Sequence, residues 1–276
     1  MAQSVVKATA WLQGLGKGDL MSPFFDGEQL YVITQKSGDI LAVNSFGQTS
    51  KYMNTGGTPQ SAVFDHANGR LLVADFAHGA VLSLSLDGGT QETLVGVYED
   101  KPLKGPHSIV VTPGAIIFSD SGALGETGLH SPSGSLFAIT TGGRGAALKP
   151  LSLSTLASPA GIAASGKLIY VAETMTNRVL RYFQQPEGVY HGSVFVQLSG
   201  GIGPVALAVD AQGSLYVGVT DTKDCGAGGR VLVLSSAGEH VSTIVTPGPE
   251  ISGLAISGNV LYVTEKSQGC ICRVPL

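Results

Sequence analysis

The sequence predicts an all-β protein, a six-bladed β-propeller. A strand-like unit recurs six times at intervals of roughly 36 to 53 residues, which is typical of propeller blades. Helical spacing of apolar residues is almost absent. The chain has 39 glycines, 13 prolines and 13 % charged residues, a composition that favours short strands joined by tight turns. Its 276 residues fit one large all-β domain.

The most regular strand of the repeat is an apolar run of five residues. It occurs as LYVIT from Leu30, LLVAD from Leu71, IIFSD from Ile116, IYVAE from Ile169, LYVGV from Leu215 and LYVTE from Leu261. A shorter apolar run precedes each of these segments and another follows, so we expect first and third strands around each. Weaker fourth strands are expected at Ser50 to Met53, Glu92 to Val97, Leu148 to Leu153, Ser193 to Leu198 and His240 to Val245.

The last unit ends after its third strand, whereas a spare strand-like segment, Val5 to Leu12, precedes the first unit. We therefore expect this N-terminal segment to complete the last blade, which closes the ring and protects its edges. The alternative is an open solenoid or two sandwiches. The prediction is one domain, 1–276, with blades at 18–54, 55–103, 104–154, 155–199, 200–248 and 249–276 plus 4–13.

Charge and hydropathy exclude several partners. The net charge is −4 with no lysine or arginine run, so we expect no nucleic acid. No apolar run approaches the roughly 18 to 20 residues of a membrane span, so we expect no membrane. The N-terminus lacks the apolar stretch of a secretory signal, which favours a cytoplasmic protein. We expect a monomer whose partner is an unknown protein or small-molecule ligand.

The cysteines agree with an intracellular setting, because Cys225, Cys270 and Cys272 form no zinc-binding pattern. Free thiols are the favoured interpretation. A Cys225–Cys270 disulfide is the alternative, since both are expected in loops on the same face of neighbouring blades.

Two rings of residues are expected at one end of the propeller, where each first strand begins and each second strand ends. The inner ring, at the channel mouth, is Met21, Gln60, His107, Ala160, Val205 and Ser252. The outer ring is Thr34, Asp75, Asp120, Glu173, Val219 and Glu265. Four members of the outer ring are acids.

Two segments carry a resemblance to known families. They are YVAETMTNRVLRYFQQPEGVYHGSVFVQLSGGIGPVALAVDAQGSLYVGV from Tyr170 and KGPHSIVVTPGAIIFSDSGALGETGLHSPSGSLFAI from Lys104. Both resemble the strictosidine synthase-like proteins and the senescence-marker-protein/gluconolactonase family, and the repeats are similar to NHL repeats. The gluconolactonase resemblance implies a divalent metal, often calcium, in the channel mouth. Its glutamate, asparagine and aspartate ligands would fall on Met21, His107, Ala160 and Val205.

These positions depart from both families' chemistry. Calcium needs hard oxygen ligands, and of the four side chains only the His107 imidazole is a ligand at all. The strictosidine synthases use no metal, and the resemblance to them places their catalytic glutamate on Ser252. A serine hydroxyl cannot take over the proton transfer of that glutamate at neutral pH. We therefore expect no cofactor and a family site that has lost its ligands.

His107 and Asp120 are the candidate catalytic residues, because the imidazole could act as a base that the carboxylate orients. The alternative is a channel-lining histidine bonded to water or backbone. The acids Asp75, Asp120, Glu173 and Glu265 are candidates for a cation site on the top face. The favoured alternative is a structural role, with each acid bonding backbone or a turn arginine, as Arg178 would for Glu173.

Two functions follow. The first is a non-catalytic module that binds a protein or small ligand at the channel mouth. The second is a metal-independent enzyme, of strictosidine synthase or lactone/ester hydrolase type, that uses His107. A filled apolar channel would favour the first, and a pocket with a perturbed histidine pKa the second. The long insertion Ser121 to Gly134 is either a lid, a partner contact or a plain loop.

Overall fold

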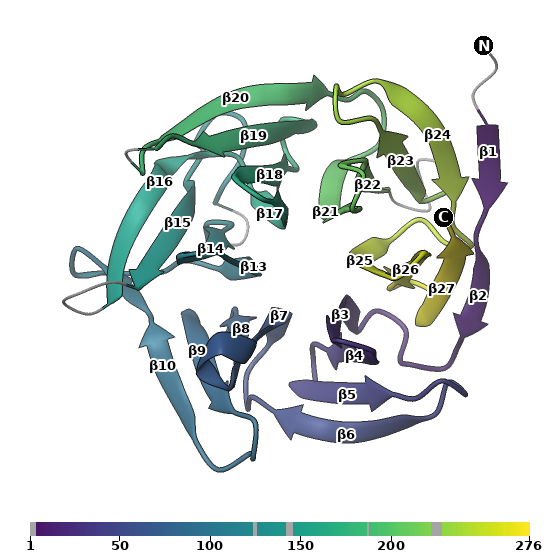
Figure 1. The fold of residues 1–276 in the computed structure, drawn as a ribbon, viewed down its shortest axis with the longest axis horizontal. Helices are drawn as coiled ribbons and strands as arrows, with labels where there is room; N and C mark the ends of the chain where they lie inside the picture. The colour runs from purple at the N-terminus through teal and green to yellow at the C-terminus, as the bar shows by residue number, and fades with distance from the viewer. Residues whose placement is uncertain (1–3, 124–125, 142–145, 187, 222–227) are drawn as a thin grey trace.

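The computed structural model describes residues 4–123, 126–141, 146–186, 188–221 and 228–276. Six antiparallel sheets stand around a central axis (Figure 1), which confirms the six-bladed β-propeller. The described residues contain no α-helix, only the short 3₁₀ turn η1 (His66–Asn68). None of the described helices is long and apolar enough to cross a membrane.

The blades follow one another along the chain, each running from the channel outwards. The first three sheets contain β3 (Leu20–Asp26), β4 (Gln29–Thr34), β5 (Asp39–Val43) and β6 (Thr49–Asn54); β7 (Pro59–Asp65), β8 (Arg70–Asp75), β9 (Ala80–Ser85) and β10 (Gln91–Val95); and β13 (Pro106–Thr112), β14 (Ala115–Asp120), β15 (Gly134–Thr141) and β16 (Ala146–Leu156). The next three contain β17 (Pro159–Ser165), β18 (Leu168–Glu173), β19 (Arg178–Gln184) and β20 (Tyr190–Gln197); β21 (Gly203–Val209), β22 (Leu215–Thr220), β23 (Arg230–Leu234) and β24 (His240–Val245); and β25 (Ile251–Ser257), β26 (Val260–Glu265) and β27 (Cys270–Pro275).

The N-terminal segment closes the ring in two steps. The strand β2 (Thr9–Leu12) pairs antiparallel with β27 and completes the last blade, as the sequence predicts. The preceding β1 (Ser4–Lys7) does not share that sheet. It pairs in parallel with β24 and adds a fifth strand to the neighbouring blade. The single strand expected from Val5 to Leu12 is therefore two strands, which bridge two blades (Figure 1).

The core is divided among the interfaces between blades. Each first strand packs against the first strand of the next blade, and β25 packs against β3 to close the circle. A separate cluster of buried apolar side chains fills each interface, because both faces of a blade are covered by its neighbours. At the closing interface, Leu20 and Val32 of the first blade meet Ile271 of the last.

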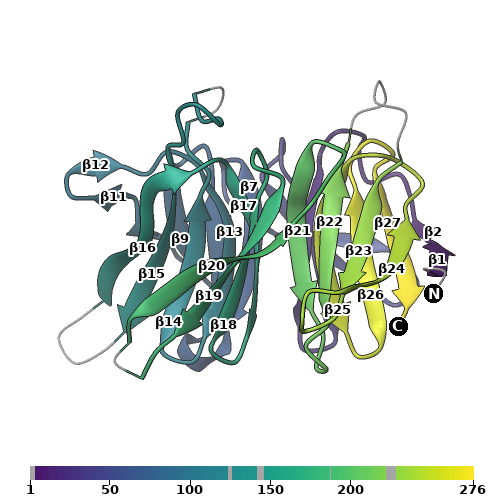
Figure 2. The same cartoon turned by 90° about the horizontal axis from the view of Figure 1, so that it is seen from above.

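Between the second and third blades, the chain forms a small hairpin of β11 (Val97–Tyr98) and β12 (Lys101–Pro102). It projects outward near the end of the propeller at which β13 begins (Figure 2). Cys270 and Cys272 lie buried on β27 as free thiols. Because Cys270 is a free thiol, it does not form the alternative Cys225–Cys270 disulfide. Cys225 itself lies outside the described residues.

Candidate channel-mouth site

Strand pairing places the two predicted rings side by side. In every blade the outer-ring residue pairs with the residue that directly precedes the inner-ring one. The pairs are Leu20 with Thr34, Pro59 with Asp75, Pro106 with Asp120, Pro159 with Glu173, Pro204 with Val219 and Ile251 with Glu265. The antiparallel register then shifts within the next residues of each first strand. The six repeats are therefore equivalent at this end.

The residue after each inner-ring position is small, because adjacent first strands approach closely around the channel. A Cβ atom added at Gly161 would lie 2.7 Å from Ala206 Cα, and one added at Gly253 would lie 2.6 Å from Ser22 Cα. At these two positions any side chain, even the methyl group of alanine, would therefore force the strands apart.

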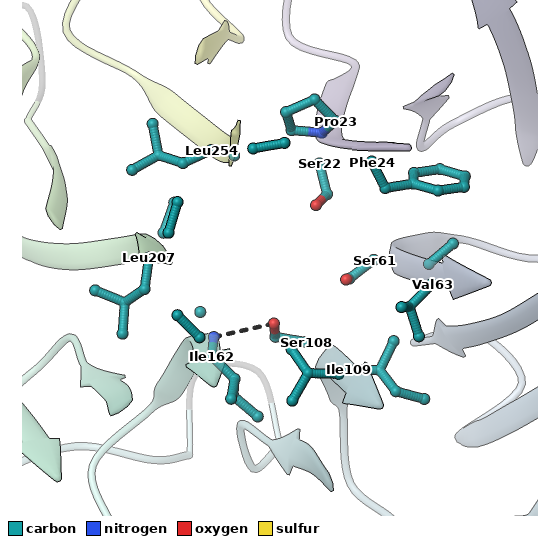
Figure 3. A pocket seen from close by; sticks show the side chains of 18 of the residues that line it. Ser22, Pro23, Phe24, Ser61, Val63, Ser108, Ile109, Ile162, Leu207 and Leu254 are labelled. Carbon is teal, nitrogen blue, oxygen red and sulfur yellow. Dashed lines mark hydrogen bonds between the residues drawn. The ribbon is translucent and has the colours of Figure 1, made fainter. Parts of the chain in front are cut away.

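The six first strands enclose a central channel with a cavity of about 280 Å³. Figure 3 shows hydroxyls of Ser22, Ser61 and Ser108 among the apolar side chains of the lining. Of the inner-ring residues, Gln60, His107, Val205 and Ser252 line the cavity, whereas Met21 and Ala160 do not. Among the described residues, the lining contains no lysine, arginine, aspartate or glutamate, and His107 is the one titratable side chain of that part. The channel is polar on part of its wall and is not filled.

His107 is held in a neutral form. Its Nδ1 atom is buried and has no hydrogen-bond partner among the described residues. Burial, and the positive charge of Lys266, lower the pKa of His107 from 6.5 to about 4. The imidazole is therefore uncharged at neutral pH and able to accept a proton or a hydrogen bond.

The predicted pairing of His107 with Asp120 is wrong. The Asp120 carboxylate is buried and accepts hydrogen bonds from the backbone N–H groups of Lys104, at 3.0 Å, and Gly105. Burial raises the pKa of this carboxyl, and those backbone hydrogen bonds oppose the rise. Asp120 therefore holds the connection that leads into its own blade. Its oxygens bond to backbone N–H groups there and not to the His107 imidazole.

The other acids of the outer ring act in the same way, which contradicts an open cation site on the top face. Asp75, Glu173 and Glu265 are at most 1 % exposed. Asp75 accepts from Thr58 N at 3.0 Å, Glu173 from Ala157 N at 2.8 Å and Glu265 from Glu250 N at 3.0 Å. Each acid thus fixes the segment that enters its blade. Arg178 Nε also donates to Glu173, as the structural alternative predicts.

Blades one and five lack the acid. Thr34 Oγ1 instead lies 2.8 Å from Ser37 Oγ within its own turn. Val219 is buried in the apolar interface between blades four and five. The acid is therefore a repeated device for anchoring the incoming segment, present in four of the six blades.

The residues present do not fit the family's metal site. Met21 and Ala160 are buried, and Val205 is partly buried, at positions where the resemblance implies oxygen ligands. Among the described residues, no three His, Cys, Asp or Glu side chains are grouped so that they could hold a metal ion. Ser252, at the position of the strictosidine synthase glutamate, directs its hydroxyl to Thr264 Oγ1 at 3.1 Å. The four positions at which the resemblance implies calcium ligands therefore offer no carboxylate.

The sequence analysis missed Lys266, which follows Glu265 directly. Its Nζ atom lies 3.2 Å from Gln35 Oε1 and 3.9 Å from Met21 Sδ, on the neighbouring first blade. The position after the outer-ring residue faces the next blade elsewhere too. Ser121 Oγ donates to the Pro159 carbonyl and Thr174 Oγ1 to that of Pro204, at 2.7 and 2.8 Å. Extending the repeat alignment by one residue would have revealed a third ring with one cation.

The long insertion, Ser121 to Gly134, is anchored at its base by that Ser121 hydrogen bond. Further along, the backbone N–H of Ser133 donates to Thr127 Oγ1 at 3.3 Å. The side chains of Glu126 and His130 are exposed. Residues 124–125 lie outside the described part of this loop.

Comparison with known proteins identifies the class. The family described as SMP-30/Gluconolactonase/LRE-like region matches residues 22–267, so this chain belongs to that family. Of the families that the sequence resembles, this match supports the gluconolactonase one. The chain is similar to the lactonase drp35 of Staphylococcus aureus strain MW2, with 24 % identity over 97 % of this chain and 82 % of the relative.

Solved structures support the same fold. A gluconolactonase from Xanthomonas campestris superposes with a TM-score of 0.78 at 21 % identity, covering 95 % of this chain and 87 % of that one. The calcium-binding protein regucalcin from Agrobacterium tumefaciens also superposes with a TM-score of 0.78, at 18 % identity, covering 99 % and 95 %. At these identities the likeness concerns the fold.

Proposed function

We propose that this protein hydrolyses lactones or related esters at the channel mouth, without a divalent metal, and that His107 serves as the base. The observation that carries the proposal is the neutral His107 imidazole, the one titratable group among the described residues that line the channel cavity. A channel cavity that contains a histidine with a perturbed pKa favours an enzyme over a propeller whose channel is filled. The lactonase relatives are consistent with this reaction class.

The reaction needs one proton acceptor and one nucleophile. As water attacks the carbonyl carbon, the His107 imidazole takes the proton that the water loses. It returns this proton to the ring oxygen when the acyl carbon–oxygen bond breaks. The net products are a hydroxy carboxylate and one released proton. Because its pKa is low, His107 is a weak base, so we expect modest rates from it alone.

A second candidate is a non-catalytic module that binds a small ligand in the same channel. It is favoured by the positions of Met21, Ala160 and Val205, where family ligands are replaced by side chains that do no chemistry. Asp120 also does not support His107 as a catalytic partner. On this alternative the channel binds without turnover.

The test is the hydrolysis of a panel of lactones and aryl esters by metal-stripped protein in the presence of a chelator. The rate of hydrolysis is measured from the protons released. His107→Gln should lower turnover by about a hundredfold or more. His191→Gln is the matched control, because His191 is exposed on β20, the outermost strand of blade four. Equal rates for the wild type and His107→Gln, or loss of activity with chelator, would overturn the proposal. Binding without any turnover would favour the second candidate.

A further inference from the structure

The Lys266 ammonium group lies beside Met21 of the inner ring, next to the residues that line the cavity and not among them. Lys266 Nζ lies 3.9 Å from the sulfur of Met21, the position at which the family resemblance implies a glutamate ligand. The Lys266 side chain is partly buried. No described carboxylate lies within 4.0 Å of its ammonium group. Among the described residues, its side chain donates a hydrogen bond to the Gln35 amide oxygen, at 3.2 Å.

The backbone of Lys266 is fixed by both of its neighbouring segments. Its N–H donates to the Glu250 carbonyl at 2.8 Å, and its carbonyl accepts from Gly18 N at 2.7 Å. The Gly18 bond joins the last blade to the segment entering the first. The side chain therefore starts from an anchored point at the closing interface of the ring, which limits its movement away from the mouth.

The charge of Lys266 also reaches across the mouth. Lys266 belongs to the sixth blade, and His107 begins the third, which stands on the opposite side of the ring (Figure 1). The Lys266 charge nevertheless contributes to the lowered pKa of His107. Burial lowers the pKa of Lys266 itself, while Glu250 and Asp19 raise it and Lys36 lowers it. A molecule in the channel mouth would thus lie between an ammonium group and a neutral imidazole.

We propose that the Lys266 ammonium takes the place of the family's metal as the positive charge of the site, binding the carboxylate of a hydroxy acid and the oxyanion formed from its lactone. The inference deepens the proposed function and uses the same site. It explains why the Met21 position has no carboxylate, since a glutamate there would neutralise the ammonium group. The described residues of the lining include no acid that would repel an anion, and they offer the Ser22 and Ser61 hydroxyls to it.

Binding of anions tests the inference apart from turnover. The probes are 4-hydroxybutyrate and gluconate, each matched with its uncharged primary amide, titrated by calorimetry. The carboxylates should bind the wild type at least about tenfold more tightly than the amides, and Lys266→Gln should remove that preference. Lys266→Arg should keep it, which separates charge from folding. Lys36→Gln is the matched control, because Lys36 is an exposed lysine of the neighbouring turn.

Several results would overturn the inference: no carboxylate binds, carboxylates and amides bind alike, or Lys266→Gln binds as Lys36→Gln does. The experiments distinguish failure of the anion-binding proposal from failure of the proposed hydrolase function. Lactone turnover that depends on His107 but not on Lys266 would leave the hydrolase standing without this cation. Carboxylate binding that depends on Lys266, with no turnover of any lactone, would leave the anion site standing and remove the hydrolase.

Discussion

Lys266 Nζ lies 3.9 Å from Met21 Sδ, although 245 positions separate the two residues in the chain. The contact crosses the interface at which the last blade closes on the first. It brings a positively charged group to the position where the gluconolactonase resemblance implies a negatively charged metal ligand. The chemistry of this channel mouth is therefore expected to differ from that of the family's metal-binding members.

Metal-stripped protein is expected to show no saturable rise in melting temperature with calcium, zinc or manganese. Oxygen ligands are missing at Met21, His107, Ala160 and Val205, and the Lys266 charge repels a cation. A ligand that binds only the folded state would add about 2.7 kcal/mol at a hundredfold excess over Kd, which a melt detects readily.

A matched variant provides the positive control for this titration. Met21→Glu, His107→Asn, Ala160→Asn and Val205→Asp, combined with Lys266→Gln, would install the implied ligand set and remove the competing charge. This variant should gain calcium-dependent stability. A saturable metal response of the wild-type protein would contradict the prediction.

Glu173→Ala should destabilise the fold by about 3 kcal/mol. The substitution removes the buried acceptor of Ala157 N–H and the partner of Arg178. Thr34→Ala, at the equivalent position of blade one, should cost only about 1 kcal/mol, since it removes the contacts of one neutral hydroxyl with Ser37 Oγ and the Asp39 carbonyl. Urea denaturation followed by circular dichroism measures both. Equal losses would show that the buried acid does not anchor its blade.

His107 should make the protein less stable as pH falls from 6.5 towards 4. The unfolded chain gains the proton near pH 6.5, whereas the folded protein gains it only near pH 4, because burial and Lys266 disfavour the imidazolium. Within that window the unfolded state binds more protons, so the free energy of unfolding falls by on the order of 1–3 kcal/mol. Above pH 6.5 the contribution is constant.

His107→Asn isolates this contribution, because all other titrating groups are shared with the wild type. The difference in unfolding free energy between the two proteins should change between about pH 7 and about pH 4.5. Parallel pH profiles would mean that His107 is not buried in a neutral form.

Removal of residues 1–13 should lower the melting temperature strongly and produce oligomers. Without β2, the edge of β27 is unpaired and Tyr262 and Arg273 lose the Trp11 ring that packs against them. Removal of residues 1–7 is the matched control, because all four residues of β1 are exposed. Size-exclusion chromatography and thermal melts compare the two. Similar behaviour of both truncations would contradict ring closure through β2.

The repeat in the sequence predicts the fold because the strand pattern is local. Each blade carries its own set of short apolar runs separated by turn residues, and six copies of that pattern fix the number of blades. The two rings at the channel mouth follow from the same local spacing. Position along a strand determines which end of the blade a residue occupies, so the pairs such as Pro59 with Asp75 occur in every blade.

The partners of each functional side chain could not be predicted from the repeat, because they come from connecting segments and neighbouring blades that the repeat alignment does not compare. Asp120 lies in the same blade as His107, yet the N–H groups of the incoming connection at Lys104 and Gly105 occupy its oxygens. The segment from Val5 to Leu12 divides between two blades because two different strand edges are open to it. Lys266 meets Met21 only when the ring closes.

The sequence by itself determined the strands, the six-fold repeat and the loss of the family's ligand types at the channel mouth, because these depend on residue identity and local spacing. The tertiary structure decided which acids are buried, which imidazole is left unpaired and where a positive charge stands. Hydrogen bonds and Coulomb interactions join atoms that are close in space, and ring closure brings the first and last blades together at the chemically distinctive point of this channel.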